Sequence, residues 1–341
     1  MVSLRGGPFA RLKKRVRRQR LILRAILRRR ALVSVVDRTS AVSKTDILAF
    51  FVFRNESDRL PFFLDYYRRL GVTHFFAVDN DSTDGGADLL KDQPDVSLWH
   101  TRDSYKDSRF GMDWVNWLLF RYGHGHWCLT VDPDEFLVYP HHDTRSLVAL
   151  TDWLNDKKIG SFSAMLLDMY AKDDLPVVEY QPGGNPFDIL CWFDPYNYTI
   201  KKNGFYGNLW VQGGVRRRVF FSKKPKLAPA LNKIPLVKWD RRYCYVSSTH
   251  MLLPSRLNKV YATDGGEKIC GCLLHSKFTA GIVQKSIEEI DRRQHYGGGR
   301  EYDAYLKSLT RKDKLWCSES MRYEGWRQLV RIGLMSTGGW V

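Results

Sequence analysis

The sequence predicts an α/β fold, in which a mostly parallel, Rossmann-like sheet is covered by helices on both faces. Two observations support this prediction: apolar runs of strand length alternate with segments of helical periodicity, and the connections between them are short. The 341 residues are more than one compact domain needs. We therefore divide the chain into a basic N-terminal arm (1–44), an α/β domain (45–310) and a C-terminal extension (311–341).

Each element of the predicted sheet follows from its residue pattern. Residues 47–53 form a continuous apolar run, which is typical of a strand buried on both faces. Apolar residues then recur at helical spacing from Leu60 to Leu70, and Gly71 is placed to end that helix. The same reasoning predicts alternating strands and helices at residues 72–78, 87–90, 96–99, 108–122 and 127–131.

The second half of the chain is less regular. Gly, Pro, Asn and aromatic residues dominate several stretches of residues 150–270. We expect strands and loops there that form an irregular lobe on the same domain. Helical spacing returns at residues 286–294 and 302–309, so two more helices are predicted near the end of the domain.

The net charge of +17 comes mainly from the N-terminal arm, where residues 1–30 hold twelve Arg and Lys and no acidic residue. Residues 11–30 are predicted to form a basic helix with apolar residues among the charges. Three alternatives stay open for it: a disordered solvated tail, a helix on an anionic membrane surface, or a contact with nucleic acid. Nucleic acid is the least favoured partner, because no aromatic residues interleave with these charges.

Cysteine content and hydropathy indicate where the protein works. The six cysteines are too few for a disulfide scaffold and are expected to be reduced thiols. No apolar run approaches the roughly 18 residues that a membrane span needs, and Arg24 and Arg28 interrupt any secretory signal. We expect a cytoplasmic protein, peripheral on the inner face of the membrane if residues 11–30 bind it.

Polar clusters follow three of the predicted strands, at residues 54–56, 79–84 and 132–135. Ligands of parallel sheets bind at the carboxyl ends of strands, so these clusters predict one site. Asp132 and Asp134 flank Pro133 and offer paired oxygen ligands that suit Mg²⁺ or Mn²⁺. A metal that bridges a diphosphate stabilises the charge that develops on a leaving nucleotide.

Two runs of the sequence carry a family resemblance: AFFVFRNESDRLPFFLDYYRRLGVTHFFAVDNDSTDGG and CLTVDPDEFLVYP. They resemble the glycosyltransferase family 2-like group, which has the GT-A fold, and VDNDSTD is similar to the VDDGSTD signature of that superfamily. The later segments GGVRRRVFF, KIPLVKW and LLHSKF look like a bacterial subgroup from polysaccharide gene clusters. The resemblance covers about residues 45–305 and implies a GT-A domain with an irregular lobe on the acceptor side.

The resemblance implies a role for individual residues. The donor nucleotide would be bound by Arg54, Asn55, Glu56, Asp79 and Asn80. A Mn²⁺ or Mg²⁺ ion would be held by Asp132, Asp134 and His275, with Asp132 and Lys277 also facing the donor diphosphate.

The general base is expected among acceptor-side carboxylates, because family 2 enzymes invert the anomeric centre. Asp194 has aromatic neighbours that raise a carboxylate pKa and stack on sugars, and Asp240 follows KIPLVKW. These two are the alternative candidates. Further residues left open as the base or as a sugar platform are Asp173, Asp174, Glu179, Trp192, Trp210 and Trp239.

The favoured function is a metal-dependent glycosyltransferase of the hexosyltransferase type. It would move a sugar from a nucleotide-diphosphate donor to a glycan or lipid-linked acceptor. The first alternative is a haloacid-dehalogenase-type phosphohydrolase with Asp132 as nucleophile, although its motif normally opens the domain and three strand units precede it here. The second alternative is a non-enzymatic protein of the same fold that binds a nucleotide or glycan.

Overall fold

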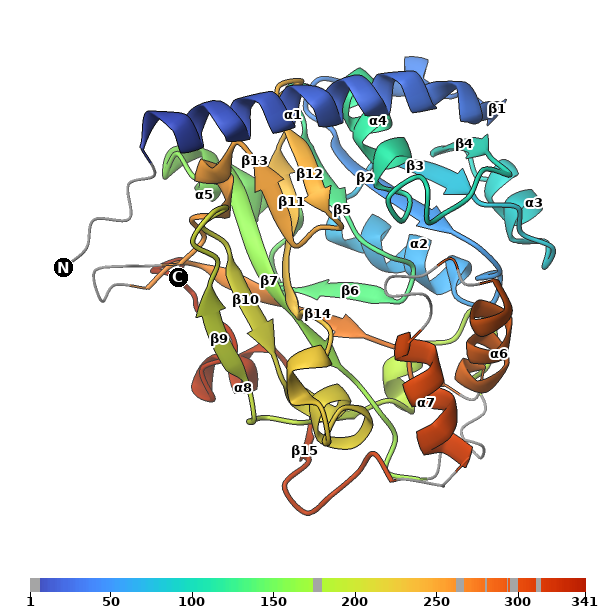
Figure 1. Cartoon of the computed structure of the whole chain (residues 1–341), viewed down its shortest axis with the longest axis vertical. Helices are drawn as coiled ribbons and strands as arrows, with labels where there is room; N and C mark the ends of the chain where they lie inside the picture. Colours follow the sequence, from blue (N-terminus) through green and yellow to red (C-terminus); the bar gives the residue numbers. More distant parts are fainter. Residues whose placement is uncertain are drawn as a thin grey trace.

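The computed structural model describes residues 7–173, 180–261, 267–279, 281–292, 294, 300–310 and 314–341. Its centre is a nine-stranded sheet with the order β1-β4-β3-β2-β5-β11-β7-β14-β6 (Figure 1). The strands of this sheet are β1 (Val33–Val36), β2 (Ile47–Phe53), β3 (His74–Asp79), β4 (Val96–His100), β5 (Trp127–Thr130), β6 (Glu135–Val138), β7 (Ser161–Asp168), β11 (Asn232–Lys238) and β14 (Cys270–His275).

The sheet is mostly parallel, as predicted. Strands β2, β3, β4, β5, β7 and β14 run in one direction, whereas β1, β11 and β6 run in the other. The helices are α1 (Pro8–Arg28), α2 (Leu60–Leu70), α3 (Gly86–Lys91), α4 (Met112–Tyr122), α5 (Leu147–Asp156), α6 (Ile282–Arg292), α7 (Arg300–Thr310) and α8 (Trp326–Arg331).

Helices cover both faces of the sheet, because its central strands are apolar on both sides. Phe51 of β2 lies in a core cluster with residues of α2 and α5, whereas Phe50 lies in a second cluster with residues of α4. Helix α2 buries the predicted apolar positions and ends at Gly71, which has a φ of 102°. A glycine adopts this left-handed conformation without the strain that a Cβ would add. These features confirm the predicted α/β class.

The irregular region differs in part from the predicted lobe of strands and loops on the same domain. Strands β7 and β11 lie inside the central sheet. Outside it, the described residues form two hairpins, β9–β10 (Thr199–Lys202 and Leu209–Gln212) and β12–β13 (Cys244–Ser247 and Met251–Leu253), and β8 (Trp192–Phe193) pairs with β15 (Met321–Arg322). The sheet therefore takes strands from both halves of the chain.

The two ends of the chain also pack on the domain. Strand β1 pairs with β4 at the edge of the sheet, although it lies within the predicted arm. Helix α1 contacts α4 and β12, so the disordered-tail alternative for residues 11–30 is wrong. Trp326 and Leu329 of α8 lie in the first core cluster, as does Trp340. Among the residues described, no helix combines the length and the apolar character needed to cross a bilayer.

Candidate functional site

The register of the sheet places three polar residues side by side, at the ends of three neighbouring strands. His275, the last residue of β14, is paired with Asp168 of β7 on one side and with Glu135 of β6 on the other. Each of these residues ends or begins a strand, so its side chain lies where the backbone ladder stops. This pairing brings together segments that are far apart in the sequence.

The turn between β5 and β6 contributes the two predicted aspartates. The amide of Glu135 donates to the carbonyl oxygen of Asp132 at 2.9 Å, which closes the turn around Pro133. The amide of Ser276 donates to the carbonyl oxygen of Asp134 at 2.9 Å. The second of these bonds joins the turn to the end of β14, next to His275.

A chain of charged side chains runs from the turn into the protein. His275 faces Asp134 Oδ2 through Nε2 at 3.2 Å and Asp168 Oδ1 through Nδ1 at 2.6 Å. Asp168 Oδ2 accepts a hydrogen bond from Arg216 Nε at 2.7 Å. Asp168, His275 and Arg216 are all buried. The carboxylates and the cations of this chain alternate, so each buried charge has an opposite neighbour.

Electrostatics favour the charged form of each member of this chain. Burial opposes ionisation of Asp134, but the charge and hydrogen bond of His275, together with the charges of Arg59 and Lys285, hold the pKa of Asp134 well below its usual range. Burial alone would lower the pKa of His275, yet Asp134 and then Asp168 raise it above its usual value. Burial also opposes ionisation of Asp168, and Arg216 nevertheless lowers its pKa. The two carboxylates therefore favour the protonated form of His275.

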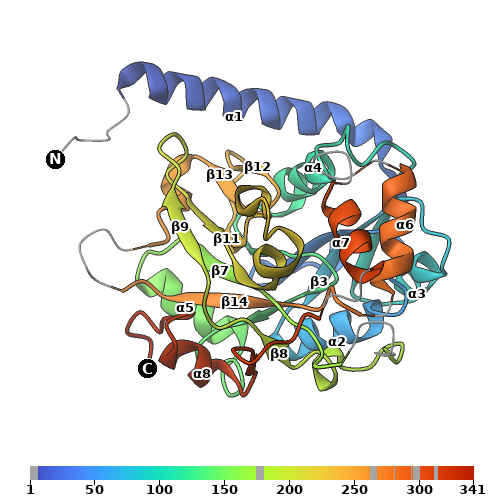
Figure 2. The ribbon, with the colours of Figure 1, turned by 60° about the horizontal axis from the view of Figure 1, so that its bottom comes forward.

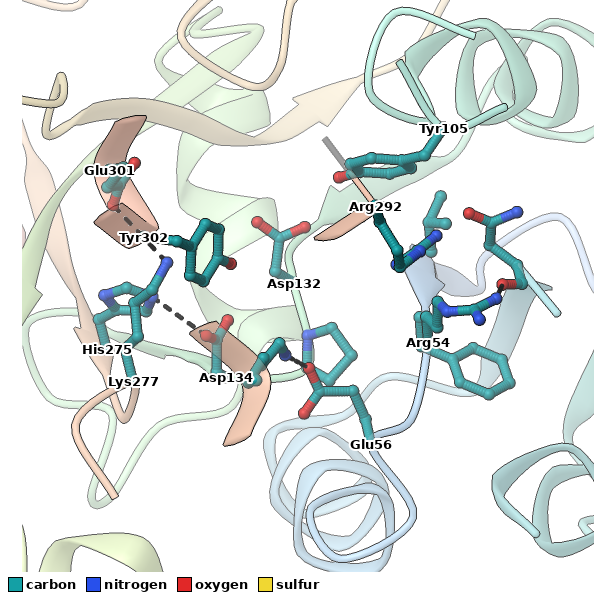
Figure 3. Close-up of a pocket in the computed structure, with 15 residues that line it drawn as sticks. Arg54, Glu56, Tyr105, Asp132, Asp134, His275, Lys277, Arg292, Glu301 and Tyr302 are labelled. Carbon is teal, nitrogen blue, oxygen red and sulfur yellow. Dashed lines mark hydrogen bonds and ion pairs between the residues drawn. The ribbon is translucent and has the colours of Figure 1, made fainter. Parts of the chain in front are cut away.

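Asp134 and His275 line a central cavity of about 200 Å³, which lies at the carboxyl ends of β2, β3 and β5. Figure 3 shows Asp132 and Asp134 rising from one turn, with His275 beside Asp134. Seven of the predicted site residues line it: Arg54, Glu56, Asn80, Asp132, Asp134, His275 and Lys277. The predicted polar clusters thus converge on one cavity, as the strand directions require.

Four cations line the central cavity: Arg54, Lys277, Lys285 and Arg292. Lysine and arginine side chains among them contact carboxylates. Lys285 Nζ contacts Glu56, Lys277 Nζ lies 3.7 Å from Glu301, and Arg54 Nε lies 3.3 Å from Glu288. An anionic ligand would compete with these carboxylates for the same cations. Several of the same residues also line an adjoining cavity of about 840 Å³, so the ligand space is larger than the centre alone.

The residues predicted to bind the nucleotide do not all face one cavity. The Asp79 carboxylate lies 2.9 Å from His100 Nδ1 and accepts a hydrogen bond from the Ser82 amide at 2.9 Å. Asp79 therefore shapes the turn after β3. Asn80 and Arg54 instead line a neighbouring cavity of about 330 Å³, together with Tyr105. Asn55 lies on the other side, where its amide donates to Glu288 Oε1 at 3.3 Å.

A fourth cavity, of about 700 Å³, adjoins the central cavity. Its wall contains Asp132, Glu301 and Tyr105, which also line the central cavity. Trp210 lies on this wall, as one of the three predicted platform residues. Trp239 is buried in the core against α4, and Trp192 packs near Trp316 with ring centroids 6.0 Å apart. We call this cavity the acceptor-side cavity.

The positions of Asp194 and Asp240 argue against both as a general base. Asp194 accepts two hydrogen bonds from Arg218, each 2.8 Å long, and lies away from the central and acceptor-side cavities as the described residues define them. Asp240 follows β11, which is antiparallel to β5, so it lies at the opposite end of the sheet from Asp132. Hydrogen bonds from Arg242 lower the pKa of Asp240 to about 2, which makes it a weak base.

Three further carboxylates were left open as the general base. Asp173 is exposed beyond the end of β7. Asp174 and Glu179 lie outside the described residues.

The side chains predicted to bind a metal suit a divalent cation only in part. A histidine that binds a metal usually donates its other ring N–H to a carboxylate, and Asp168 occupies that position for His275. Asp134 lies on the opposite side of the ring. Within the described ranges, however, no three or more His, Cys, Asp or Glu side chains form a group that could hold a metal ion. Asp132 stands apart with its side chain 54% exposed, and it would have to turn toward Asp134 and His275.

The sequence prediction missed several residues of this site. Asp168 ends an apolar run, Met165-Leu166-Leu167, which is the same signal that singled out Asp132, but the surrounding region looked irregular. Lys233 is a buried cation on β11 whose Nζ lies 2.8 Å from Glu135 and 3.7 Å from Asp132. No sequence signal distinguished the remaining cavity residues, Tyr105, Lys285, Arg292, Glu301 and Tyr302.

No model of a known protein family matches the sequence, and no curated protein matches it significantly.

Proposed function

We propose that the protein is a metal-dependent glycosyltransferase with a GT-A-like domain. The observation that supports this most is the convergence of Asp132, Asp134 and His275 with four cations on one cavity at the carboxyl ends of parallel strands. A nucleotide-diphosphate sugar needs such a combination, because its diphosphate is anionic and its leaving group gains charge during transfer. The resemblance of the two long sequence runs to family 2 points to the same chemistry.

In this proposal the donor diphosphate lies against the cations of the central cavity. Lys277 and Lys285 contact it in place of their present carboxylate partners, and Arg54 extends from the end of β2 toward the nucleotide. Asp134 and His275, with Asp132, would hold Mn²⁺ or Mg²⁺, which supplies Lewis-acid stabilisation of the leaving diphosphate. Loss of the proton from His275 Nε2 is the requirement for that binding.

The acceptor lies in the acceptor-side cavity, where Trp210 offers an aromatic face to a sugar ring. Of the carboxylates on both cavity walls, Asp132 is assigned to the metal, so Glu301 takes the role of base. The acceptor hydroxyl oxygen attacks the anomeric carbon, and its proton passes to the Glu301 carboxylate. The bond between that carbon and the diphosphate oxygen breaks, and the nucleoside diphosphate leaves.

The proposed location is the cytoplasmic face of the membrane. All six cysteines are free thiols, which fits a reducing compartment. A glycan or a lipid-linked glycan is the proposed acceptor class.

Binding of the donor product tests the proposal directly. Calorimetric titration with a panel of nucleoside diphosphates is expected to give saturable binding in Mn²⁺ and clearly weaker binding in a chelator. A ligand at 100 times its dissociation constant adds about 2.7 kcal/mol to the free energy of unfolding, so thermal shift provides a second reading. Metal-independent binding, or none, would contradict the proposal. Trapping of a phosphoaspartate at Asp132 would support the phosphohydrolase instead.

Glu301→Gln tests the assignment of the base. The amide keeps the shape of the side chain but accepts a proton poorly, so kcat is expected to fall by about a hundredfold. The Mn²⁺ affinity is expected to stay close to wild type, because Glu301 is not assigned to the metal. The KM for the donor is expected to fall, because the neutral amide no longer competes with the diphosphate for Lys277, whose Nζ lies 3.7 Å from Glu301. Steady-state transfer assays measure both. Glu319→Gln, at an exposed residue, is the matched control. An unchanged kcat for Glu301→Gln would remove Glu301 from the mechanism.

A further inference from the structure

Helix α1 is held against the domain by one of its faces. Ala25 is buried, and Arg24 Nε donates to Asp113 Oδ2 at 2.7 Å. Arg24 Nη2 also donates to the carbonyl oxygen of Asp107 at 2.5 Å, and Arg28 Nη1 lies 3.3 Å from Asp103 Oδ2. These contacts fix the rotation of the helix about its own axis. They therefore determine which side chains point away from the protein.

The opposite face of α1 carries a stripe of exposed apolar side chains. Successive members are three, four, seven and four residues apart, which places them on one side of a helix. Their exposed fractions range from 38% to 80%. Figure 2 shows α1 along one side of the molecule, with the other labelled elements all on its inner side. The members of the stripe are Phe9, Leu12, Val16, Leu23 and Leu27.

Basic residues border this stripe. The helix Pro8–Arg28 contains no acidic residue, and its last turn ends in Arg28. Three exposed cations lie beside the stripe: Lys13 and Arg20 on one side, and Arg15 on the other. An apolar face bordered by Lys and Arg is the arrangement that binds the interface of an anionic bilayer.

We propose that the outer face of α1 docks on the surface of an anionic lipid bilayer, with the helix lying parallel to the membrane plane. The stripe would enter the acyl boundary while the flanking cations contact lipid phosphates. Charge complementarity selects this partner over a second copy of the chain. Two copies packed through the stripe would bring their basic borders together, and like charges at such an interface repel.

The same features argue against nucleic acid as the partner. The residues that point outward along the centre of the face are apolar, so the closest approach to a phosphate backbone would bury leucines against charge. Docking at a bilayer uses both the apolar and the basic residues. The inference stands on α1 alone and does not depend on the glycosyltransferase assignment.

Vesicle sedimentation with the full-length protein tests the inference. Wild type is expected to bind vesicles of equimolar phosphatidylcholine and phosphatidylglycerol and to stay in solution with pure phosphatidylcholine. Leu12→Gln/Leu23→Gln is expected to weaken the binding by roughly tenfold or more, because two side chains no longer enter the lipid. Lys13→Gln/Arg20→Gln is expected to weaken it by a similar factor in low salt, and by less in high salt.

The control places the same substitution at exposed apolar residues elsewhere. Val148 and Ile200 are exposed on α5 and β9, so Val148→Gln/Ile200→Gln is expected to bind vesicles as wild type does. Circular dichroism of each variant checks that the helix is retained. Equal binding of Leu12→Gln/Leu23→Gln and wild type would overturn the proposal. So would a concentration-dependent dimer, in light scattering, that the same two substitutions abolish.

Discussion

Asp134→Ala is expected to reduce sugar transfer by about a thousandfold, because removal of a metal ligand forfeits several kcal/mol of transition-state stabilisation. The substitution removes the carboxylate that faces His275 Nε2 at 3.2 Å and leaves the backbone contact between Ser276 and the turn in place. The fold should therefore survive. The measurement is transfer and donor hydrolysis in Mn²⁺, with the metal concentration varied.

The metal dependence of the residual activity distinguishes a metal ligand from a residue that acts in the reaction in another way. If Asp134 binds the cation, the variant needs a much higher Mn²⁺ concentration for half-maximal rate. Asp156→Ala, at an exposed position on α5, serves as the control and is expected to match wild type in both rate and metal dependence. Wild-type metal-dependent activity in Asp134→Ala would refute the proposed site. Loss of rate with unchanged Mn²⁺ dependence would assign Asp134 to the reaction but not to the metal.

Asp168→Ala is expected to lower the free energy of unfolding by about 3–5 kcal/mol, because it removes the nearer of two carboxylates that contact the buried Arg216 guanidinium, the other being Glu301 at 3.3 Å. Asp168 and Arg216 have side chains that are 3% and 5% exposed and lie 2.7 Å apart. The same change removes the acceptor for His275 Nδ1. Denaturation in urea, with the slope compared between variants, measures the loss.

Two further variants separate the buried charge from other effects of the substitution. Asp65→Ala breaks the exposed pair with Arg69, whose side chains are both 62% exposed, and is expected to cost about 0–1 kcal/mol. Asp168→Ala/Arg216→Met removes both charges and is expected to recover part of the lost stability. A loss for Asp168→Ala as small as that for Asp65→Ala would show that the Asp168–Arg216 pair is not the anchor that its burial suggests.

Local patterns were sufficient to predict the first half of the fold. The apolar run Ile47–Phe53, the helical spacing from Leu60 to Leu70 and the glycine at 71 each determine an element through residues that are near in sequence. The position of Asp132 and Asp134 after β5 follows in the same way. These features depend on periodicity and turn chemistry, which a single sequence displays directly.

The site residues that were predicted wrongly or not predicted owe their positions to strand order, strand direction and tertiary packing. Asp168 and His275 are 107 residues apart, and only the pairing of β7 with β14 brings them together. Asp240 was a plausible base until β11 proved antiparallel to β5, since an apolar strand pattern reads the same in both directions. Glu301 has no local signal, because its helix reaches the cavities only through tertiary packing.

The contact between Arg24 and Asp107 links the N-terminal helix to the loop that carries Tyr105 and Phe110. A shift of α1 must break that hydrogen bond or pull the loop, and the loop forms part of three cavity walls. Free-energy coupling between two positions is reciprocal, so a ligand on the outside of α1 that shifts the helix would change the affinity of the cavities by the same factor by which their ligand changes its own. Helix α1 would then influence ligand binding in the cavities as well as attach the protein to a surface.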